Sequence, residues 1–284
     1  LGALAGDHLD TCARLADKHT PILHARDRFG NDVQRIEYHP AYRELERIGF
    51  GEFGIHAMSH RKGILGWPGT YPAAAKHAFT YLFNQAEFGM GCPLNVTDGA
   101  AMLLARYGDA ALKAKYLDRL TQGAQFMTEK EGGSDVGSLT TIARPEGDHW
   151  RLHGDKWFCS NADAGIIMLL ARPEGAVSGT RGVGLFLMPR FLDDGSVNNY
   201  RIVRLKDKLG TRSMASGEIK LEGALAYSVG DIGRGFADAA DWPQPPDVGL
   251  AFSPADARSR FGDPANARGP CRRPHSTPRD RSRP

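Results

Sequence analysis

The sequence predicts a multidomain α+β protein, in which an N-terminal helical domain is followed by an antiparallel β-barrel or β-sandwich domain. Apolar residues recur at helical spacing over most of residues 1–122. From residue 123 the apolar period changes to two, and Gly, Pro, Asp and Asn turns recur about every ten residues. A third observation is a break in composition after residue 241, where regular patterning ends.

Length and composition suit an ordinary globular protein. A chain of 284 residues that is 41% hydrophobic and 24% charged can bury a sizeable core. The last 43 residues hold eight Arg and four Asp, an excess of four positive charges, whereas the whole chain carries +3, so residues 1–241 carry −1. This distribution gives no electrostatic reason to expect nucleic-acid binding by the patterned region.

The cysteines and the hydropathy point to an intracellular protein. Cys12, Cys92, Cys159 and Cys271 are far apart and lack the spacing of a zinc site, so we expect reduced thiols, no disulfide and no metal. No apolar run approaches 18 residues, so we expect no membrane contact and a cytoplasmic location. Because the chain opens on Leu1, its true start and any targeting segment stay open.

The helical part is predicted from apolar spacing and capping signals. Helices are expected over residues 1–19, from Ala41 onward, over Ala73–Glu87, over Asn95–Tyr107 and over Gly108–Gly123 with Asp109 as N-cap. Residues 20–38 indicate extended structure. Three glycines after Ala41 leave an intact helix and a helix broken by a turn equally open. The segment Gly89–Pro93 is expected to separate two helices.

The second part contains short runs of β-branched, aromatic and aliphatic residues. Six strands are expected in "TTIARP", "HWRLHGDKWFCS", "GIIMLLARP", "GVGLFLMPR", "NNYRIVRLK" and "SGEIKLEGALAY". Ile166–Ala171 is apolar on both faces and should be central, whereas His149–Trp157 alternates and should have one solvent face.

The loop "QFMTEKEGGS", Gln125–Ser134, has the composition of a ligand-binding turn. Two adjacent glycines, Gly132 and Gly133, let the backbone approach a ligand and point its N–H groups at an anion. The hydroxyls of Thr128 and Ser134 add uncharged hydrogen-bonding groups. The sequence alone leaves two readings open, a cradle for a pyrophosphate or a flavin ring and an ordinary turn.

Together with "GDKWFCSN", Gly154–Asn161, this loop resembles the flavin-binding signature of the acyl-CoA dehydrogenase superfamily. The wording "MTEKEGGSDV", with Lys130, most resembles the AidB-type branch, the flavoproteins of the bacterial alkylation response. The resemblance extends over roughly residues 20–240. Further matches are "EFGMGCP", "RLKDKLGTRSMAS" and "GDIGRGF". For Gly89–Pro93 the resemblance implies, as an alternative to a simple break between helices, a place near the acyl pocket.

The resemblance implies FAD as cofactor, which accepts a hydride from the β-carbon of an acyl-CoA thioester while a carboxylate takes the α-proton. It implies that Thr128 lies at the pyrimidine side of the flavin, that Phe158 covers a ring face and that Ser160 faces the N5 edge. Cys159 is interpreted as a small wall residue and Asp135 as a turn-capping carboxylate. The full set of implied cofactor-binding residues is Gln125, Phe126, Met127, Thr128, Gly133, Ser134, Phe158, Cys159 and Ser160.

The resemblance also implies partners. These are an acyl-CoA thioester as substrate, an electron-transfer flavoprotein or similar acceptor, and a homotetramer for the full-length form. The alternative to acyl-CoA dehydrogenation is an AidB-type alkylation-response flavoprotein that associates with DNA and has little dehydrogenase activity. DNA would then be contacted only through the C-terminal domain of the family. The catalytic base of the family is a Glu in that domain, so no catalytic residue is assigned here. Glu129 and Glu131 are near the flavin by sequence, but nothing in the sequence indicates that they reach a substrate.

The C-terminal helical domain of the family is expected to be absent from this chain. Residues 242–284 hold nine of the seventeen prolines and no Lys, Glu, Ile, Met or Tyr, and we interpret them as a disordered Pro/Arg-rich tail. Two origins of these residues stay open, an out-of-frame or chimeric end and a natural tail. The expected domains are 1–122 (helical), 123–229 (β-domain with flavin-binding loops), 230–241 (start of a truncated helix) and 242–284 (tail).

Overall fold

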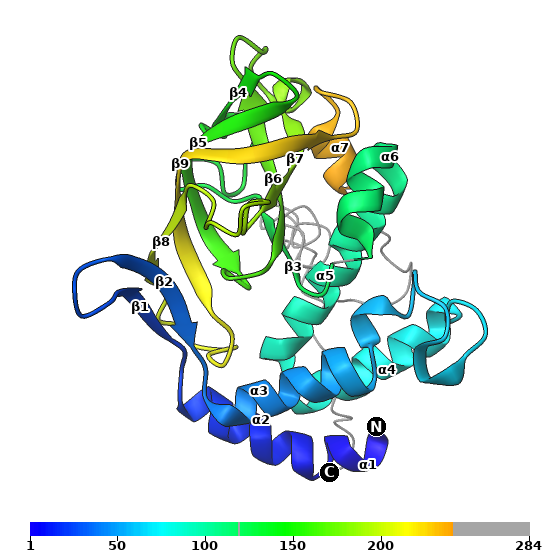
Figure 1. Cartoon of the computed structure of the whole chain (residues 1–284). Coiled ribbons are helices and arrows are strands. Elements are labelled where there is room, and N and C mark those ends of the chain that lie inside the picture. The colour runs from blue at the N-terminus through cyan, green and yellow to red at the C-terminus, as the bar shows by residue number, and fades with distance from the viewer. Residues whose placement is uncertain (119, 241–284) are drawn as a thin grey trace, which may run out of the picture. The chain divides into compact units, whose positions relative to one another are not determined.

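A computed structural model describes residues 1–118 and 120–240 of the chain. The predicted tail and residue 241 lie outside the described residues. Most helices belong to the first 118 residues, and all but two strands follow from Gly123 (Figure 1). The predicted α+β class is confirmed.

The regular elements follow the order expected from the change in hydrophobic period. The helices are α1 (Gly2–Ala5), α2 (His8–Lys18), α3 (Pro40–Glu46), α4 (Ala73–Ala86), α5 (Phe88–Tyr107), α6 (Ala110–Leu112) and α7 (Gly235–Ala240). The strands are β1 (Ile22–Arg26), β2 (Asp32–Glu37), β3 (Gly123–Phe126), β4 (Ile142–Glu146), β5 (His149–Ser160), β6 (Ile166–Pro173), β7 (Gly184–Pro189), β8 (Tyr200–Leu205) and β9 (Ser216–Val229). None of the helices in the described part is long and apolar enough to cross a membrane.

The predicted N-cap at Asp109 is confirmed, and the helix that was left open between two forms is broken. Asp109 accepts a hydrogen bond from the N–H of Leu112 at 2.8 Å, as an N-cap does. His39 caps α3 by accepting from the N–H of Ala41 at 3.1 Å. After α3 the chain continues as a π-helical segment and then turns at Gly54, whose φ of +58° suits a residue without a Cβ.

The predicted break at Gly89–Pro93 is wrong, because these residues form the first turns of α5. Glu87 is the N-cap and accepts from the N–H of Gly89. The glycines permit close packing rather than a turn, since a Cβ on Gly89 would overlap the hydroxyl of Ser213 and one on Gly91 would overlap the amide of Asn84. Helix α5 is buried along most of its length, so tertiary packing outweighs the low helix propensity of this segment.

Strands β3–β9 form a mixed sheet, so the purely antiparallel arrangement predicted from the sequence is wrong. Strands β3 and β4 run parallel to β6, whereas β4–β5, β5–β9, β7–β9, β8–β9 and β6–β7 are antiparallel pairs. Apolar alternation reports which face is buried and contains no information on strand direction. Strand β6 pairs with β3, β4 and β7 and is almost fully buried, which confirms the central position predicted for Ile166–Ala171.

Helix α5 joins the helical part to the sheet. Its Thr97 hydroxyl accepts from the N–H of Gly123 at 2.9 Å, and a Cβ on Gly123 would lie 3.0 Å from Cβ of Ala100. A second connection runs through the β1–β2 hairpin, where the Gln34 side chain accepts from the N–H of Ile202 at 2.7 Å. The sheet is therefore held against α5 at one side and the hairpin at another.

The core of the sheet gives a first prediction. Phe186 is fully buried and meets Trp150 edge-on, with ring centroids 5.4 Å apart. Phe186→Ala should lower the free energy of unfolding by about 3–5 kcal/mol, measured by urea denaturation. The control Phe191→Ala removes a ring that is 53% exposed and should cost less than about 1 kcal/mol. Equal losses in the two variants would contradict this core.

Candidate functional site

The two stretches singled out from the sequence lie side by side. The N–H of Trp157 donates to the carbonyl of Thr128 at 2.8 Å. The residue before Trp157 and the residue after Thr128 are also in contact. The ammonium of Lys156 lies 2.6 Å from the carboxylate of Glu129. The loop Gln125–Ser134 and the end of β5 therefore form one site.

A β-bulge at the end of β5 shapes this site. Strand β5 pairs Lys156 with Ile219 and next pairs Cys159 with Gly217, so two residues of β5 oppose one residue of β9. Phe158 lies in the bulge with a φ of +54°, and its side chain is 59% exposed. A left-handed backbone costs an aromatic residue roughly 1–3 kcal/mol and is typical of ligand sites.

The bulge is braced by the ion pair between Lys156 and Glu129, whose side chains are 0% and 1% exposed. Lys156 also donates to the carbonyl of Leu170 at 2.6 Å. Glu129 also accepts from the N–H and hydroxyl of Thr140 and from the N–H of Thr141. Burial alone would raise the pKa of Glu129, but the ammonium and these hydrogen bonds outweigh burial and lower that pKa below its ordinary value. Glu129 is therefore a structural carboxylate, not a base.

Two of the implied cofactor-binding residues turn their side chains into the core. Phe126 and Cys159 are 1% and 0% exposed, so only their main chains are available to a ligand. Successive side chains of β3 point to opposite faces of the strand, and the bulge in β5 turns Cys159 inward. Burial raises the pKa of the Cys159 thiol well above its ordinary value, which agrees with a wall residue.

The other implied residues are half-buried or exposed, and the amide of Gln125 is unpaired. Thr128, Gly133, Met127 and Ser160 are half-buried and Ser134 is exposed. The amide Nε2 of Gln125 is buried without an acceptor among the described residues, so it is available to donate to a bound ligand. Asp135 accepts from the N–H of Gly137 at 3.0 Å, which confirms it as a turn-capping carboxylate.

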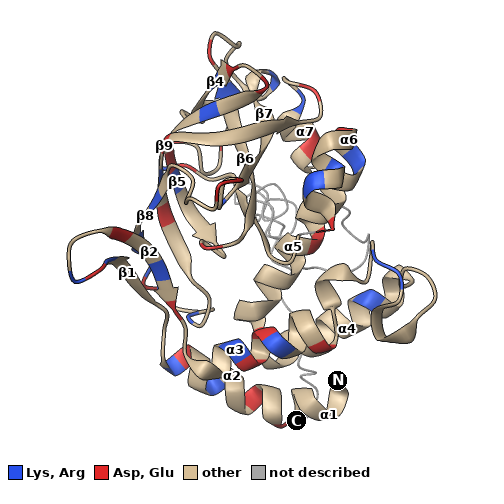
Figure 2. Cartoon of the chain, in the orientation of Figure 1, with Lys and Arg blue, Asp and Glu red and all other residues tan. Residues whose placement is uncertain are grey.

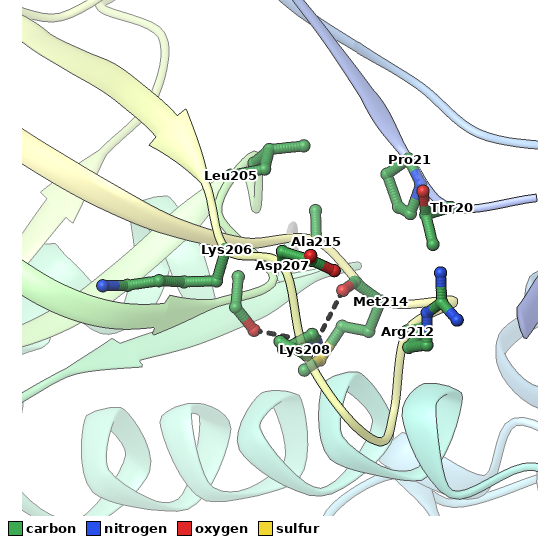
Figure 3. A pocket seen from close by; sticks show the side chains of 10 residues that line it. Thr20, Pro21, Leu205, Lys206, Asp207, Lys208, Arg212, Met214 and Ala215 are labelled. Carbon is green, nitrogen blue, oxygen red and sulfur yellow. Dashed lines mark hydrogen bonds between the residues drawn. The ribbon is translucent and has the colours of Figure 1, made fainter.

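The segment between β8 and β9 completes the site and was not singled out as functional from the sequence. It lines a cavity of about 240 Å³, shown in Figure 3. The ammonium of Lys206 lies 3.4 Å from the ring centroid of Trp157 and 4.6 Å from that of Phe158. The hydroxyls of Ser216 and Ser160 are 3.4 Å apart. The sequence signal for this segment was its place in "RLKDKLGTRSMAS", which matched the family without a stated role.

Comparison with known proteins identifies the family. Residues 1–125 match the family described as adaptive response protein AidB N-terminal domain, and residues 124–224 match the acyl-CoA dehydrogenase middle domain. The chain belongs to the acyl-CoA dehydrogenase superfamily. Its N-terminal match agrees with the AidB-type branch of that superfamily.

Relatives of known name support the assignment. Acyl-CoA dehydrogenase family member 11 of Caenorhabditis elegans is 34% identical over 241 residues, which cover 79% of this chain and 38% of the relative. AidB of Escherichia coli is 35% identical over 245 residues, 78% of this chain and 42% of the relative. The structure of Caenorhabditis elegans ACDH-11 in complex with C11-CoA has a TM-score of 0.74 and 31% identity, over 84% of this chain and 42% of that one. The chain thus spans less than half the length of these relatives.

The buried ion pair generates the second prediction. Lys156→Met should lower the free energy of unfolding by about 3–5 kcal/mol, because it leaves the Glu129 carboxylate buried without a counter-ion. Adding Glu129→Gln should restore part of this loss, since the double variant buries no uncompensated charge. Urea denaturation measures the free energy of unfolding of both variants. If the effects of the two substitutions simply add, Lys156 and Glu129 are not coupled and the prediction is wrong. Lys220→Met, which breaks the exposed pair with Glu222, is the control and should cost less than about 1 kcal/mol.

The ion pair between Lys156 and Glu129 also determines how the free energy of unfolding depends on pH. The folded-state pKa of Glu129 is below its ordinary value of 4.5, so the carboxylate contributes stability above about pH 4.5. This contribution is lost as the pH falls through the folded-state pKa. The difference in free energy of unfolding between the wild-type chain and Glu129→Gln should therefore become smaller at acidic pH.

Proposed function

We propose that the chain binds FAD and serves in the α,β-dehydrogenation of an acyl-CoA thioester. FAD, when bound, supplies the acceptor for the hydride that leaves the β-carbon of the substrate. The observation that supports this proposal is the bulge at Trp157 and Phe158, which presents a strained, exposed ring beside the Thr128 loop. Such an aromatic face matches a planar ligand in shape and polarity.

The residues of the site suit a flavin. In this proposal Thr128 donates its hydroxyl or its N–H to the pyrimidine edge, and the orphaned amide of Gln125 supplies a second donor there. Phe158 covers one face of the ring, and the half-buried hydroxyl of Ser160 faces the N5 edge. Gly133 lies against Thr128, because a Cβ built on it would be 3.6 Å from Cγ2 of that residue.

No proton-abstracting base is assigned among the described residues of the site. Glu129 is committed to Lys156 and Asp135 to the turn at Gly137. Within the described part, therefore, the site offers groups that bind and orient a flavin rather than a group that takes the α-proton.

The proposed partners follow the family. An acyl-CoA is the proposed substrate, since the related ACDH-11 was solved with C11-CoA. An electron-transfer flavoprotein or a similar protein is the proposed acceptor, and the full-length form is proposed to be a homotetramer. For the DNA-associated alternative, Figure 2 shows basic and acidic positions mixed along α3 and the π-helical segment after it, where Arg43 pairs with Glu46 and Arg47 with Glu44. This mixed surface gives that alternative no added support.

FAD binding is the direct test and the third prediction. Quenching of FAD fluorescence on titration with the wild-type chain should reveal binding. Ser134→Trp should abolish it, because the indole fills the glycine-rich loop. Thr128→Val removes one hydrogen bond of roughly 0.5–1.5 kcal/mol and should weaken binding about threefold to tenfold. Thr11→Trp, at an exposed hydroxyl in α2, is the control, and equal FAD affinity of the Ser134 variant would refute the proposed site.

The strained aromatic gives the fourth prediction. Phe158→Gly should leave unfolding stability unchanged or raise it by about 1 kcal/mol, because glycine adopts a φ of +54° without strain. The same change should weaken FAD binding about threefold to tenfold through the lost ring contact. Phe29→Gly, at a 73% exposed ring with an ordinary φ, should leave FAD binding unchanged. A Phe158→Gly chain that loses stability and keeps its FAD affinity would show that the ring serves folding instead.

A further inference from the structure

The loop that precedes α4 lies at the outer edge of the helical part (Figure 1) and presents two apolar side chains to solvent. Its residues 63–67 form a tight turn, closed by a hydrogen bond from the first N–H to the last carbonyl at 2.8 Å. The Ile64 side chain packs inward, 3.2 Å from the place that a Cβ on Gly54 would occupy. Leu65 and Trp67 are exposed. The turn therefore divides its large apolar residues between an inner anchor and an outer tip.

The apex of this tip is a strained residue. Leu65 has a φ of +49°, in the left-handed region that glycine adopts more readily than a branched apolar residue. Backbone outliers of this kind persist only where the surrounding structure holds them, and they gather at functional sites. Burial does not account for the choice of leucine, since the side chain is exposed. The strained backbone directs an apolar group outward.

The base of the loop is firmly attached to the helices. Asp98 of α5 is buried and accepts from the ammonium of Lys76 in α4 at 2.7 Å and from the hydroxyl of Ser59. Farther along, the N–H of Tyr71 donates to the carbonyl of Met58 at 2.8 Å, which brings the two ends of the loop together. A loop that is already ordered loses little conformational entropy when its tip meets a partner.

The loop and α4 contain positive charge and no carboxylate. No Asp or Glu occurs between Glu52 and Glu87, whereas Arg61, Lys62 and Lys76 do (Figure 2). Lys76 is buried and neutralised by its acidic partner, so the cations next to the turn are the half-buried Arg61 and the exposed Lys62. This segment differs from α3, where basic and acidic side chains form pairs. Its charge is complementary to a negatively charged surface.

We propose that this loop docks the chain on the surface of a bilayer that contains anionic lipid, with Leu65 and Trp67 inserted at the interface. Tryptophan favours the boundary between headgroups and acyl chains, and cations beside an apolar tip are attracted to anionic headgroups. Lys62 lies next to the turn, where it can reach those headgroups. Two more exposed apolar residues, Tyr81 and Leu82, belong to the same carboxylate-free segment.

A lipid surface fits the tip better than a nucleic acid does. The apex is aliphatic, so it offers no flat face on which a base could stack. A surface loop requires no spanning helix, so the proposal is compatible with the lack of one in the described part. It departs from the expectation of no membrane contact, which considered long apolar runs alone. It is also independent of the proposed function, because vesicle binding is measured without FAD.

The fifth prediction is tested by co-sedimentation of the full chain with vesicles of phosphatidylcholine alone or mixed with phosphatidylserine. The wild-type chain should bind the mixed vesicles about tenfold more tightly. Leu65→Gly should weaken that binding about tenfold and leave the midpoint of urea unfolding unchanged or higher, because glycine adopts a φ of +49° without strain. Lys62→Ala should weaken it about fivefold. Phe29→Gly, at an exposed ring on the β1–β2 hairpin, is the matched control and should bind as wild type.

A second measurement reports on insertion of the tip. Vesicles with brominated acyl chains should quench the tryptophan emission of the wild-type chain. Trp67→Phe keeps an apolar ring, so it should retain most of the vesicle binding while most of the quenching is lost.

The outcomes assign the tip to one occupant. Failure of the wild-type chain to bind mixed vesicles, or equal affinity for the two kinds of vesicle, would overturn the proposal. Wild-type binding by Leu65→Gly would show that another surface contacts lipid. If Leu65→Gly instead changes the oligomeric state in sedimentation velocity and keeps its vesicle affinity, the tip contacts a second copy of the chain. A larger loss of affinity for single-stranded DNA than for vesicles would assign the tip to nucleic acid, and either result would refute the lipid surface.

Discussion

The buried pair between Lys156 and Glu129 ties four segments in and beside the sheet to one point. The carboxylate of Glu129, in the loop after β3, accepts hydrogen bonds from the N–H groups of Thr140 and Thr141 before β4. The ammonium of Lys156, in β5, contacts Glu129 and donates to the carbonyl of Leu170 in β6. Two charges in the interior must stay paired, because either one alone is strongly unfavourable there. The relative positions of these segments are therefore restricted by electrostatics as well as by packing.

This restriction explains how a strained residue persists at the site. The bulge begins directly after Lys156, and its first N–H, that of Trp157, is satisfied by Thr128 one residue before Glu129. Polar groups on both sides of the bulge are thus satisfied, and the structure tolerates Phe158 in a left-handed conformation. The result is a rigid backbone that presents an exposed aromatic ring, an arrangement that preorganises a binding site.

Local patterns in the sequence predicted the elements that depend on local physics. The apolar period placed α4 and the central strand β6, and turn chemistry assigned Asp135. Strict alternation could not predict the bulge: if β5 alternated throughout, Phe158 would share the buried face of Lys156. The extra residue reverses the parity, so Phe158 is exposed and Cys159 is buried. Strand direction and the glycines of α5 were also missed, because both depend on contacts between residues distant in the sequence.

The helical part also belongs to the site through contacts that no local pattern reveals. Glu87, the N-cap of α5, accepts from the hydroxyl of Ser213 at 2.8 Å, and Ser213 lies in the segment between β8 and β9. Two residues after Glu87, Gly89 has no room for a Cβ because Ser213 occupies that space. Helix α5 and the segment between β8 and β9 are therefore packed as one unit, and the position of Ser216 beside Ser160 depends on the helix as much as on the strand. The residues that match the N-terminal and middle domains of the family therefore pack against each other beside the candidate site.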